Sequence, residues 1–500
     1  MKTLVKNGKV FDGTGAPWYR ADILLDNGLI EAVGIMPGAA AEVVIDARGL
    51  AVVPGFIDAH SHTDMFPFPD PDGKIIQGVT TEIAGMCGLS RLPAESSMNR
   101  SGLAADLVIM VGQGRIRERV IGSADREPAA EELDRMKDLL REAMELGAAG
   151  MSSGLIYPPG CYTKTWELTE LCRVVAEYGG VYVSHIRNEA DDLIPAVEEA
   201  IAIGRESGCK VQISHHKASG KQNHGKVRQT LEMMEKARGD SVDVCCDAYP
   251  YTAGSSPTVT LLPNWVQEGG SEDMLGRLRD KDLRRRARED ILNGIPGWEN
   301  MCMNSGMDGV LVCSAPENTQ FEGKNLKEIG EIQGKDPVDA LIDLIIDEEG
   351  DGWIAHFGAC EEDNYYVLQH RLTMVGSDGW AAPCSPDIPM GKPHPRCYGT
   401  FPRVLGRYCR DLGLFPPETA IWKMTGFPAT RFGLKDRGFL MAGLIADLVI
   451  FDPDTIADNL SYQEPWAAPE GVRYVIKNGE IAVEGKRYLH NKQGKAVAVK

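Results

Sequence analysis

The sequence predicts an α/β protein with three parts: a (β/α)8 TIM-like barrel, a β-sandwich domain formed by both chain termini, and an insertion domain after the seventh barrel strand. Three observations predict this arrangement. Both ends of the chain carry short apolar strands beside Asn-Gly pairs. Eight further strands alternate with helical segments in the middle, and the interval between the last two strands is too long for one connection.

The two ends of the chain share a pattern of short strands around Asn-Gly pairs. These pairs stand at residues 7–8, 27–28 and 478–479, and residues 446–451 form a further apolar strand. Asn-Gly is the strongest short hairpin signal because both turn positions need a positive φ. Isolated hairpins are barely stable in water, so the strands of both ends need partners. We therefore predict that they join in one β-sandwich.

The middle of the chain alternates between strands and helices. The expected strands cover residues 52–57, 79–85, 106–111, 149–154, 181–185, 211–215, 243–248 and 373–378. Apolar positions keep helical spacing in residues 129–146, 165–178 and 190–207. Eight such β/α units predict a parallel barrel whose chemistry lies at the carboxyl ends of the strands. An open, doubly wound sheet is the alternative, and the polar residues at the strand ends favour the barrel.

The long interval 249–372 contains a helical, Arg-rich stretch at 276–291 and extra strands near 308–313. We interpret it as an insertion folded over the barrel mouth. The expected boundaries are 1–50 and 436–500 for the β-sandwich, 51–255 and 346–435 for the barrel, and 256–345 for the insertion.

The composition is that of an ordinary globular protein, with 43% hydrophobic and 25% charged residues. The formal net charge of −19 makes nucleic acid an unlikely partner, because an acidic surface repels phosphate. We expect no membrane span and no signal peptide, since no apolar run is long enough. Twelve cysteines are too sparse for a disulfide scaffold, which favours a reducing, cytoplasmic setting. The oligomeric state stays open.

Histidines cluster at the predicted strand ends. Residues 52–62, VVPGFIDAHSH, carry an apolar strand directly into His60 and His62. Alternation along the strand places both imidazoles on one side, where they suit a divalent metal. His185 and His215 end two further strands, and Asp378 ends the last one. An aspartate at the same rim can bind metal or accept a proton from water.

An anionic ligand is expected from the second strand. Cys87 stands at its end between glycines, and a thiolate there would bind zinc strongly. Glu82 is the alternative anion, although it lies in the middle of the strand. A buried, inert cysteine is the structural alternative.

These motifs resemble the amidohydrolase superfamily and, more narrowly, its N-acyl-D-amino-acid deacylases (D-aminoacylases). The resemblance covers nearly the whole chain. It rests on residues 54–62 (PGFIDAHSH), 78–81 with 87–88, 184–187 (SHIR), 213–217 (ISHHK), 247–251 (DAYPY), 376–379 (GSDG), 394–406 and 443–449.

The resemblance implies a metal centre and a reaction. Cys87, His185 and His215 would hold one tight Zn²⁺, and His60 and His62 would complete a second, weaker site that shares Cys87. Asp378 would contact the metal and serve as general base and later as general acid. Arg396 would bind the α-carboxylate of a small N-acyl amino acid, and Lys217, Tyr249 and Ser255 would line the same pocket. The implied reaction is zinc-dependent hydrolysis of N-acyl-D-amino acids.

Three features depart from the family pattern. Met86 and Asn188 replace an expected Asn and Asp, and the segment from Trp380 to Lys392 is longer than usual. Two other functions remain open: another amidohydrolase, either a cyclic amidase of the dihydropyrimidinase kind or a dipeptidase, and a catalytically inactive scaffold. The preferred side chain, hydrophobic or acidic, is also open.

Overall fold

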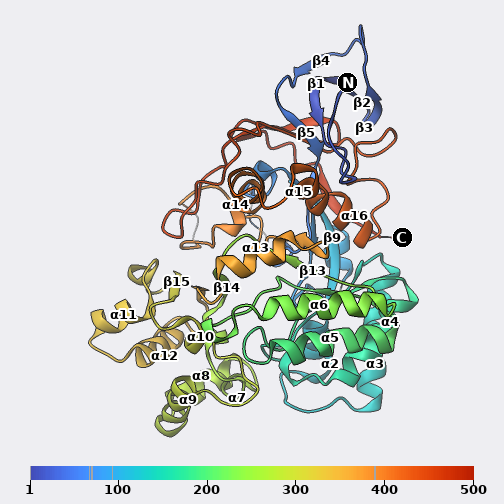
Figure 1. Ribbon diagram of the computed structural model, residues 1–500. Coiled ribbons are helices and arrows are strands. Elements are labelled where there is room, and N and C mark those ends of the chain that lie inside the picture. Colours follow the sequence, from blue (N-terminus) through green and yellow to red (C-terminus); the bar gives the residue numbers. More distant parts are fainter. Residues whose placement is uncertain (1, 67, 69–70, 93, 388–389, 500) are drawn as a thin grey trace.

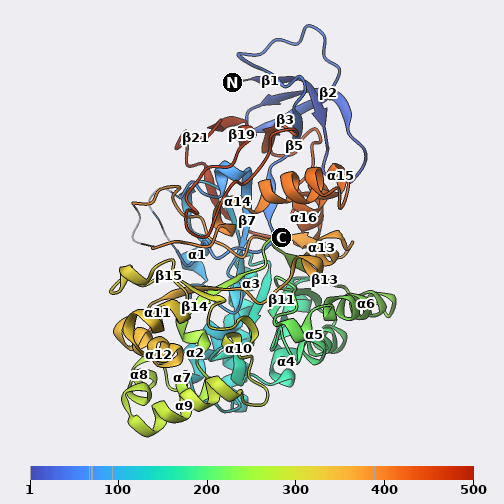
Figure 2. The ribbon, with the colours of Figure 1, turned by 60° about the vertical axis from the view of Figure 1, so that its left-hand side comes forward.

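The computed structural model describes residues 2–66, 68, 71–92, 94–387 and 390–499 of the 500-residue chain. In Figure 1, a β domain containing the N-terminal strands lies at the top, the barrel lies below it, and the insertion extends to the lower left. Figure 2 shows the same order from the side: the β domain covers one end of the barrel, and the insertion lies near the other.

The β domain combines strands from both ends of the chain. Its nine strands are β1 (Thr3–Val10), β2 (Tyr19–Asp26), β3 (Leu29–Gly34), β4 (Val43–Asp46), β5 (Ala51–Pro54), β18 (Leu448–Phe451), β19 (Val472–Lys477), β20 (Glu480–Glu484) and β21 (Arg487–Tyr488). The strand order is β21-β20-β19-β18-β5-β1-β2-β3, and β4 pairs with β1. The two ends meet where β18 pairs antiparallel with β5. Buried residues from both ends, such as Ile23 and Ile450, share one core, which confirms the predicted joining of the termini.

One predicted turn in the β domain is wrong. Asn27-Gly28 and Asn478-Gly479 form hairpin turns with positive φ at both positions. Residues 7–8 instead lie inside the continuous strand β1, where the register with β2 shifts between Val5 and Gly8. Asn7 alone has a positive φ of 61°, and its amide donates to Asp22. One left-handed residue produces a bulge, whereas the hairpin turn needs two.

The barrel contains the eight predicted strands, which confirms the predicted fold class. They are β6 (Phe56–Asp58), β7 (Val79–Ala84), β9 (Asp106–Gly112), β10 (Gly150–Gly154), β11 (Val181–His185), β12 (Lys210–Ile213), β13 (Val244–Ala248) and β17 (Thr373–Val375). All neighbouring pairs from β6 to β17 are parallel. The first and last strands approach through a parallel bridge between Ser61 and Gly379, so the barrel is nearly closed.

The predicted first strand, 52–57, is divided between two sheets. β5 ends at Pro54 in the β domain, and β6 begins at Phe56 in the barrel. Gly55 lies between them against Thr80, and a Cβ at Gly55 would fall 2.1 Å from the Thr80 hydroxyl. The close approach at Gly55 therefore lets a single apolar run serve two sheets. A short strand that the sequence did not reveal, β22 (Gly494–Val497), leaves the β domain and pairs with β9 and with β8 (Ser101–Leu103).

Helices cover the outside of the barrel sheet. They are α1 (Glu95–Met98), α2 (Gln113–Ile121), α3 (Ala130–Glu145), α4 (Thr165–Glu177), α5 (Leu193–Ser207), α6 (Lys226–Gly239), α13 (Glu361–Gln369), α14 (Arg396–Arg403), α15 (Pro417–Met424) and α16 (Gly426–Arg431). Apolar side chains of α3 to α6 pack on the strands in one large core. The three helices predicted at 129–146, 165–178 and 190–207 are present as α3, α4 and α5.

The insertion between β13 and β17 has its own sheet and its own core. Its elements are β14 (Gly254–Pro257), α7 (Asn264–Gln267), α8 (Ser271–Arg279), α9 (Lys281–Asn293), α10 (Met301–Ser305), β15 (Val310–Ser314), α11 (Leu326–Gln333), α12 (Pro337–Asp347) and β16 (Trp353–His356). The expected helix at 276–291 is two helices, because Asp280 ends α8 and caps α9 by accepting from two backbone amides of α9. The domain boundaries given above remain predictions.

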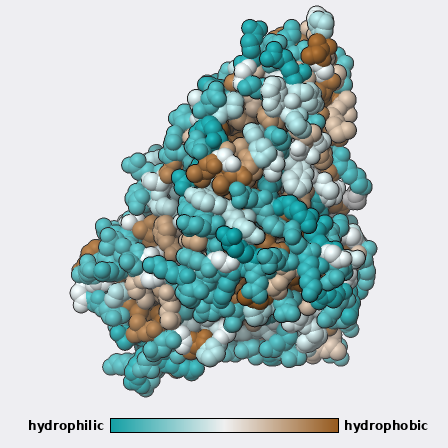
Figure 3. Space-filling model, in the orientation of Figure 1, coloured by the Kyte–Doolittle hydropathy of each residue, from teal (hydrophilic) through white to brown (hydrophobic). Residues whose placement is uncertain are grey.

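Hydrophilic residues cover most of the face shown in Figure 3, and the hydrophobic ones form scattered groups. Among the described residues, none of the helices combines the length and apolarity needed to cross a bilayer.

Candidate metal centre and active site

Six predicted site residues meet at the carboxyl ends of the barrel strands. His60 and His62 follow β6, Cys87 follows β7, His185 ends β11, His215 follows β12, and Asp378 follows β17. Parallel strands of a barrel bring such positions to one rim. They lie in the protein interior: His60 is fully buried, and the exposed fraction of the Cys87, His215 and Asp378 side chains is small.

Two groups of potential metal ligands share Cys87. One consists of His60, His62, Cys87 and Asp378, and the other of Cys87, His185 and His215; in each group the ligand atoms lie within 4.8 Å of one another. Cys87 Sγ lies 3.4 Å from His60 Nε2 and 3.5 Å from His215 Nε2. Asp378 Oδ1 lies 3.0 Å from His62 Nε2. The structure therefore brings together every residue that the resemblance assigned to metal.

The alternative anion does not join these groups. Glu82 Oε2 accepts hydrogen bonds from the Ser61 and Thr63 hydroxyls, at 2.6 Å each. The Glu82 side chain is thereby held away from the cluster, and Cys87 is the residue that both groups of potential ligands share.

The backbone at the cluster is unusual. Cys87, His215 and Asp378 have φ values of 53°, 33° and 54°. Residues other than glycine rarely adopt this left-handed region, and such strain is concentrated at functional sites. Each of the three directly follows the end of a strand or its adjoining turn, so the left-handed residue turns the side chain into the barrel mouth.

Neighbouring groups favour the charged forms of Cys87 and Asp378. Burial raises the pKa of the Cys87 thiol, but the charge of His60 and the nearby imidazoles of His185 and His215 outweigh burial and hold this pKa well below its usual value. Burial likewise raises the pKa of Asp378, and the charges of Arg396 and His215 overcome it, so the pKa lies well below its usual range. A thiolate and a carboxylate are therefore available as ligands.

A buried carboxylate orients one of the histidines from the side away from the cluster: Glu189 Oε1 lies 2.9 Å from His215 Nδ1. A second, Asp247, lies near His60, with Oδ1 3.2 Å from Nδ1 but without hydrogen-bond geometry. A carboxylate on the far ring nitrogen fixes the ring and raises its basicity toward a metal. Neither contact is predicted by the sequence patterns. Asp247 stands at the end of β13 and could have been found by its position, whereas Glu189 lies in a loop that carries no comparable signal.

The described residues fit a metal ion. His185 Nε2 is buried and has no hydrogen-bond partner within the described part of the chain. An unpartnered imidazole nitrogen beside a low-pKa thiol matches the mixed nitrogen and sulfur ligands that zinc prefers.

The residues assigned to the substrate lie beside the cluster in two layers. Arg396 Nη1 donates to Asp378 Oδ2 at 2.6 Å, and Arg396 Nη2 lies 3.3 Å from the carbonyl oxygen of Ser255. Arg396 and Ser255 line the cavity that contains the cluster. Lys217 and Tyr249 lie in the layer behind: Lys217 Nζ donates to both oxygens of Glu189 at 2.8 Å, and the Tyr249 ring faces the Arg396 guanidinium 5.0 Å away.

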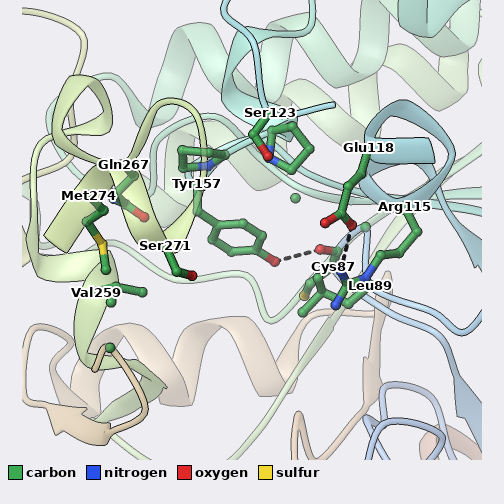
Figure 4. A pocket seen from close by; sticks show the side chains of 18 residues that line it. Cys87, Leu89, Arg115, Glu118, Ser123, Tyr157, Val259, Gln267, Ser271 and Met274 are labelled. Atoms are coloured by element: carbon green, nitrogen blue, oxygen red, sulfur yellow. Dashed lines mark hydrogen bonds and ion pairs between the residues drawn. The ribbon is translucent and has the colours of Figure 1, made fainter. Parts of the chain in front are cut away.

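Two cavities meet at the cluster. The main cavity, of about 350 Å³, contains His62, Cys87, His185, His215, Asp378 and Arg396. Its apolar wall is made by Phe66, Trp353 and Trp380, whose ring centroids lie 4.6 to 5.7 Å apart. The side cavity, of about 360 Å³, lies between the barrel and the insertion, with the Tyr157 ring in the middle and its hydroxyl directed at the Cys87 carbonyl (Figure 4).

The three departures from the family pattern lie in or near these cavities. Met86 is fully buried in the apolar layer next to Cys87. The Asn188 side chain accepts from the amides of Ala190 and Asp192 and so shapes the loop that carries Glu189. The segment from Trp380 to Lys392 begins in the aromatic wall, and its residues 388–389 lie outside the described residues.

The fold and the cluster of potential metal ligands together are those of a hydrolase of the amidohydrolase class. Residues 43–483 match the profile of the amidohydrolase family, and the chain belongs to this family.

Within the family the chain groups with the N-acyl-D-amino-acid deacylases. It is 35% identical to the D-aminoacylase of Alcaligenes xylosoxydans xylosoxydans, over 99% of this chain and 97% of that protein. The crystal structure of an N-acyl-D-glutamate deacylase from Bordetella bronchiseptica, complexed with zinc and a phosphonate inhibitor, matches with a TM-score of 0.82, 32% identity and 99% coverage of both chains. A D-aminoacylase structure described as having a binuclear metal center matches with a TM-score of 0.82, 34% identity and 99% coverage of both. The resemblance seen in the sequence is confirmed.

Proposed function

We propose that the protein hydrolyses the amide bond of N-acyl-D-amino acids to a carboxylate and a free D-amino acid, with Zn²⁺ as its metal. One observation carries this proposal: Asp378 contacts both a metal-ligand histidine and Arg396 at the wall of the same cavity. A group that can move a proton therefore lies between the metal ligands and a group that can bind a carboxylate. The 35% identity to a D-aminoacylase supports the handedness.

Cys87, His185 and His215 would hold the tight zinc ion, and His60 and His62 would complete the second, weaker position. When bound, zinc supplies a water of lowered pKa at neutral pH and polarises the substrate carbonyl. The rest of the mechanism depends on this chain's own side chains.

Asp378 handles the protons. Its lowered pKa keeps it ionised at neutral pH, so it is ready to accept a proton from the attacking water. The protonated Asp378 then donates to the departing amine nitrogen. A hydrogen bond from Arg396 to one oxygen and contact of the other with His62 hold the two oxygens in fixed directions, so the carboxyl does not need to reorient between the two steps.

Arg396 would orient the substrate. Its guanidinium is buried, and its Nε has no hydrogen-bond partner in the part of the chain described. A planar guanidinium binds a carboxylate through two parallel hydrogen bonds, which fixes the orientation of the α-carbon. Tyr249 supports the guanidinium from one face, Lys217 supports Glu189, and Ser255 contributes its carbonyl oxygen to the same wall.

The apolar wall of the main cavity suits an apolar D-side chain. Phe66, Trp353 and Trp380 lie in the same cavity as Arg396, so the amino-acid part of the substrate would contact them. A glutamate or aspartate side chain would meet these rings without a free cation, because Arg396 is engaged with the α-carboxylate and Arg115, which also lines this cavity, is paired with Glu118. We therefore propose that the enzyme prefers N-acyl derivatives of hydrophobic D-amino acids to those of acidic ones.

The test combines metal analysis with a substrate pair. We expect at least one zinc per chain by mass spectrometry and turnover of N-acetyl-D-leucine but not N-acetyl-L-leucine. Purified protein without metal and without turnover would support the inactive scaffold. Turnover of dihydrouracil or of L-substrates alone would favour another amidohydrolase. Cys87→Ala is expected to lose zinc, and full zinc with full activity in this variant would contradict the proposed ligand set.

We also propose a cytoplasmic location, since all twelve cysteines are free thiols.

A further inference from the structure

We propose that the side cavity binds the acyl part of the substrate and is built for acyl groups that contain a peptide unit beyond the reacting carbonyl. This inference rests on the proposed function and goes beyond it, because it names what the enzyme accepts on the other side of the amide bond.

The two cavities meet at the reacting centre. The residues that line both are Cys87, Leu89, Arg115, Tyr157, Pro158, Val259 and Gln267. Asp378 and Arg396 line the main cavity and are not among the residues of the side cavity. The carboxylate-bearing half of the substrate therefore belongs in the main cavity, and the reacting carbonyl belongs near Cys87, where the cavities join.

The geometry at the carbonyl carbon directs the acyl chain of the substrate away from the main cavity. The nitrogen and the acyl carbon leave a planar amide carbon in directions about 120° apart, so they cannot enter the same pocket. Once Arg396 fixes the amino-acid half, the acyl chain is directed past the Tyr157 ring into the side cavity. An acetyl group adds only one methyl there and leaves most of the roughly 360 Å³ unfilled.

The lining of the side cavity carries polar side chains on both the barrel side and the insertion side. In Figure 4, Arg115, Glu118 and Ser123 lie on the barrel side, and Gln267, Ser271 and Met274 lie on the insertion side. Arg115 Nη1 and Glu118 Oε2 form an ion pair at 2.6 Å, so the cavity offers a cationic donor and an anionic acceptor side by side. Such a wall suits a neutral group with both a donor and an acceptor, as a peptide unit has. A plain alkyl chain would desolvate these groups without replacing their hydrogen bonds.

The experiment compares three substrates that share one amino acid. They are N-acetyl-D-leucine, N-hexanoyl-D-leucine and N-acetyl-L-alanyl-D-leucine, assayed with the zinc-loaded enzyme. We expect kcat/KM for the peptide-containing substrate to exceed that for N-acetyl-D-leucine by at least about tenfold, chiefly through a lower KM, since binding remote from the reacting bond is shared by ground and transition states. N-Hexanoyl-D-leucine should gain less.

A pair of variants ties the gain to the cavity. Ser271→Phe places a ring at the cavity wall and should lower the ratio of the peptide-containing to the acetyl substrate about fivefold or more. Glu272→Phe adds the same ring at the next position of α8, which is exposed and outside the cavity lining, and should leave the ratio and the basal activity unchanged.

The outcomes separate the two proposals. No hydrolysis of any of the three substrates would overturn the proposed function. Hydrolysis of N-acetyl-D-leucine with an equal or lower kcat/KM for the peptide-containing substrate would overturn this inference alone, as would equal ratios in Ser271→Phe and Glu272→Phe.

Discussion

Two buried polar clusters lie at opposite ends of the barrel and differ in how their charges are satisfied. At the amino end of β9, Asp106 accepts from Arg437 at 2.6 Å and from Lys477 at 2.7 Å, and Lys477 also donates to Asp447 at 2.9 Å. At the carboxyl ends of the strands, the metal cluster instead gathers imidazoles around a thiol and leaves His185 Nε2 unpartnered among the described residues.

The difference teaches which cluster has a structural role and which binds a ligand. Each charge in the cluster around Asp106 is paired with an opposite one, and the cluster joins the barrel to the β domain through β19 and to the end of the chain through the amide of Lys495. In the cluster of potential metal ligands, imidazole nitrogens face one another and the Cys87 thiol. The backbone is strained at Cys87, and a cavity lies beside the cluster. Donors that are unsatisfied within the chain indicate that the missing partner is a ligand.

The largest expected effect is on activity and concerns Asp378, at the carboxyl ends of the barrel strands. Asp378→Asn removes the proton acceptor and should lower kcat/KM for N-acetyl-D-leucine by about 10²- to 10⁴-fold, the usual contribution of general acid–base catalysis. At least one zinc should remain, because Cys87, His185 and His215 are untouched. Asp452→Asn is the control: this aspartate pairs with Arg473 in the β domain and should keep full activity. Loss of all zinc together with activity would show that Asp378 acts mainly as a ligand.

At the amino ends of the barrel strands, a substitution should lower stability and leave activity unchanged. Lys477→Met leaves Asp106 and Asp447 short of a cation, and breaking a buried pair in this way destabilises by about 3–5 kcal/mol. The midpoint of thermal unfolding should fall, while turnover per folded, zinc-loaded molecule stays unchanged. Lys486→Met removes an exposed partner of Glu470 and should change stability by no more than about 1 kcal/mol. A lowered kcat with an unchanged midpoint in Lys477→Met would contradict the division into two roles.

An intermediate effect, on metal affinity, is expected at Glu189. This carboxylate is paired with Lys217 but also contacts His215 in the cluster at the barrel mouth. Glu189→Gln keeps its shape and weakens its hold on His215, and such a change behind a metal ligand lowers metal affinity by about 10- to 100-fold. Zinc loss to a chelator, followed by mass spectrometry, measures this. Glu199→Gln is the matched control, since Glu199 pairs with Arg187 at 2.9 Å away from the ligands. Equal zinc retention in both variants would remove Glu189 from the metal centre.

The clustering of the potential metal ligands could be predicted because each one follows an apolar strand, and strand ends of a barrel converge whatever the details of packing. Glu189 could not, since a loop carboxylate reaches His215 only through the tertiary path of its loop. The division of residues 52–57 is hidden in the sequence for a related reason: the apolar run is continuous, and only the close approach of Gly55 to Thr80 divides it between two sheets. The bulge at Asn7 depends on pairing with β2, which the dipeptide itself does not reveal.

A pH-dependent effect on stability, with none on the reaction, is expected at Lys423, a buried lysine whose hydrogen bonds go to the carbonyl oxygens of His370, at 2.5 Å, and Thr373, at 2.8 Å. Burial lowers the pKa of Lys423 from 10.5 to about 7. Between these values the unfolded chain binds more protons than the folded one, so the free energy of unfolding should rise with pH from about 7 to about 10.5, by at most about 1.4 kcal/mol per pH unit.

Lys423→Met should flatten this slope, and Lys486→Met, an exposed change, should retain it. Thermal unfolding of both variants and the parent across this pH range measures the difference. The same slope in Lys423→Met and the parent would assign the pH dependence to other groups. It would also mean that carbonyl oxygens satisfy the charge of Lys423 as fully as Asp106 satisfies that of Lys477. The contrast between fully paired and unpaired polar clusters would then rest on the residues around Cys87 alone.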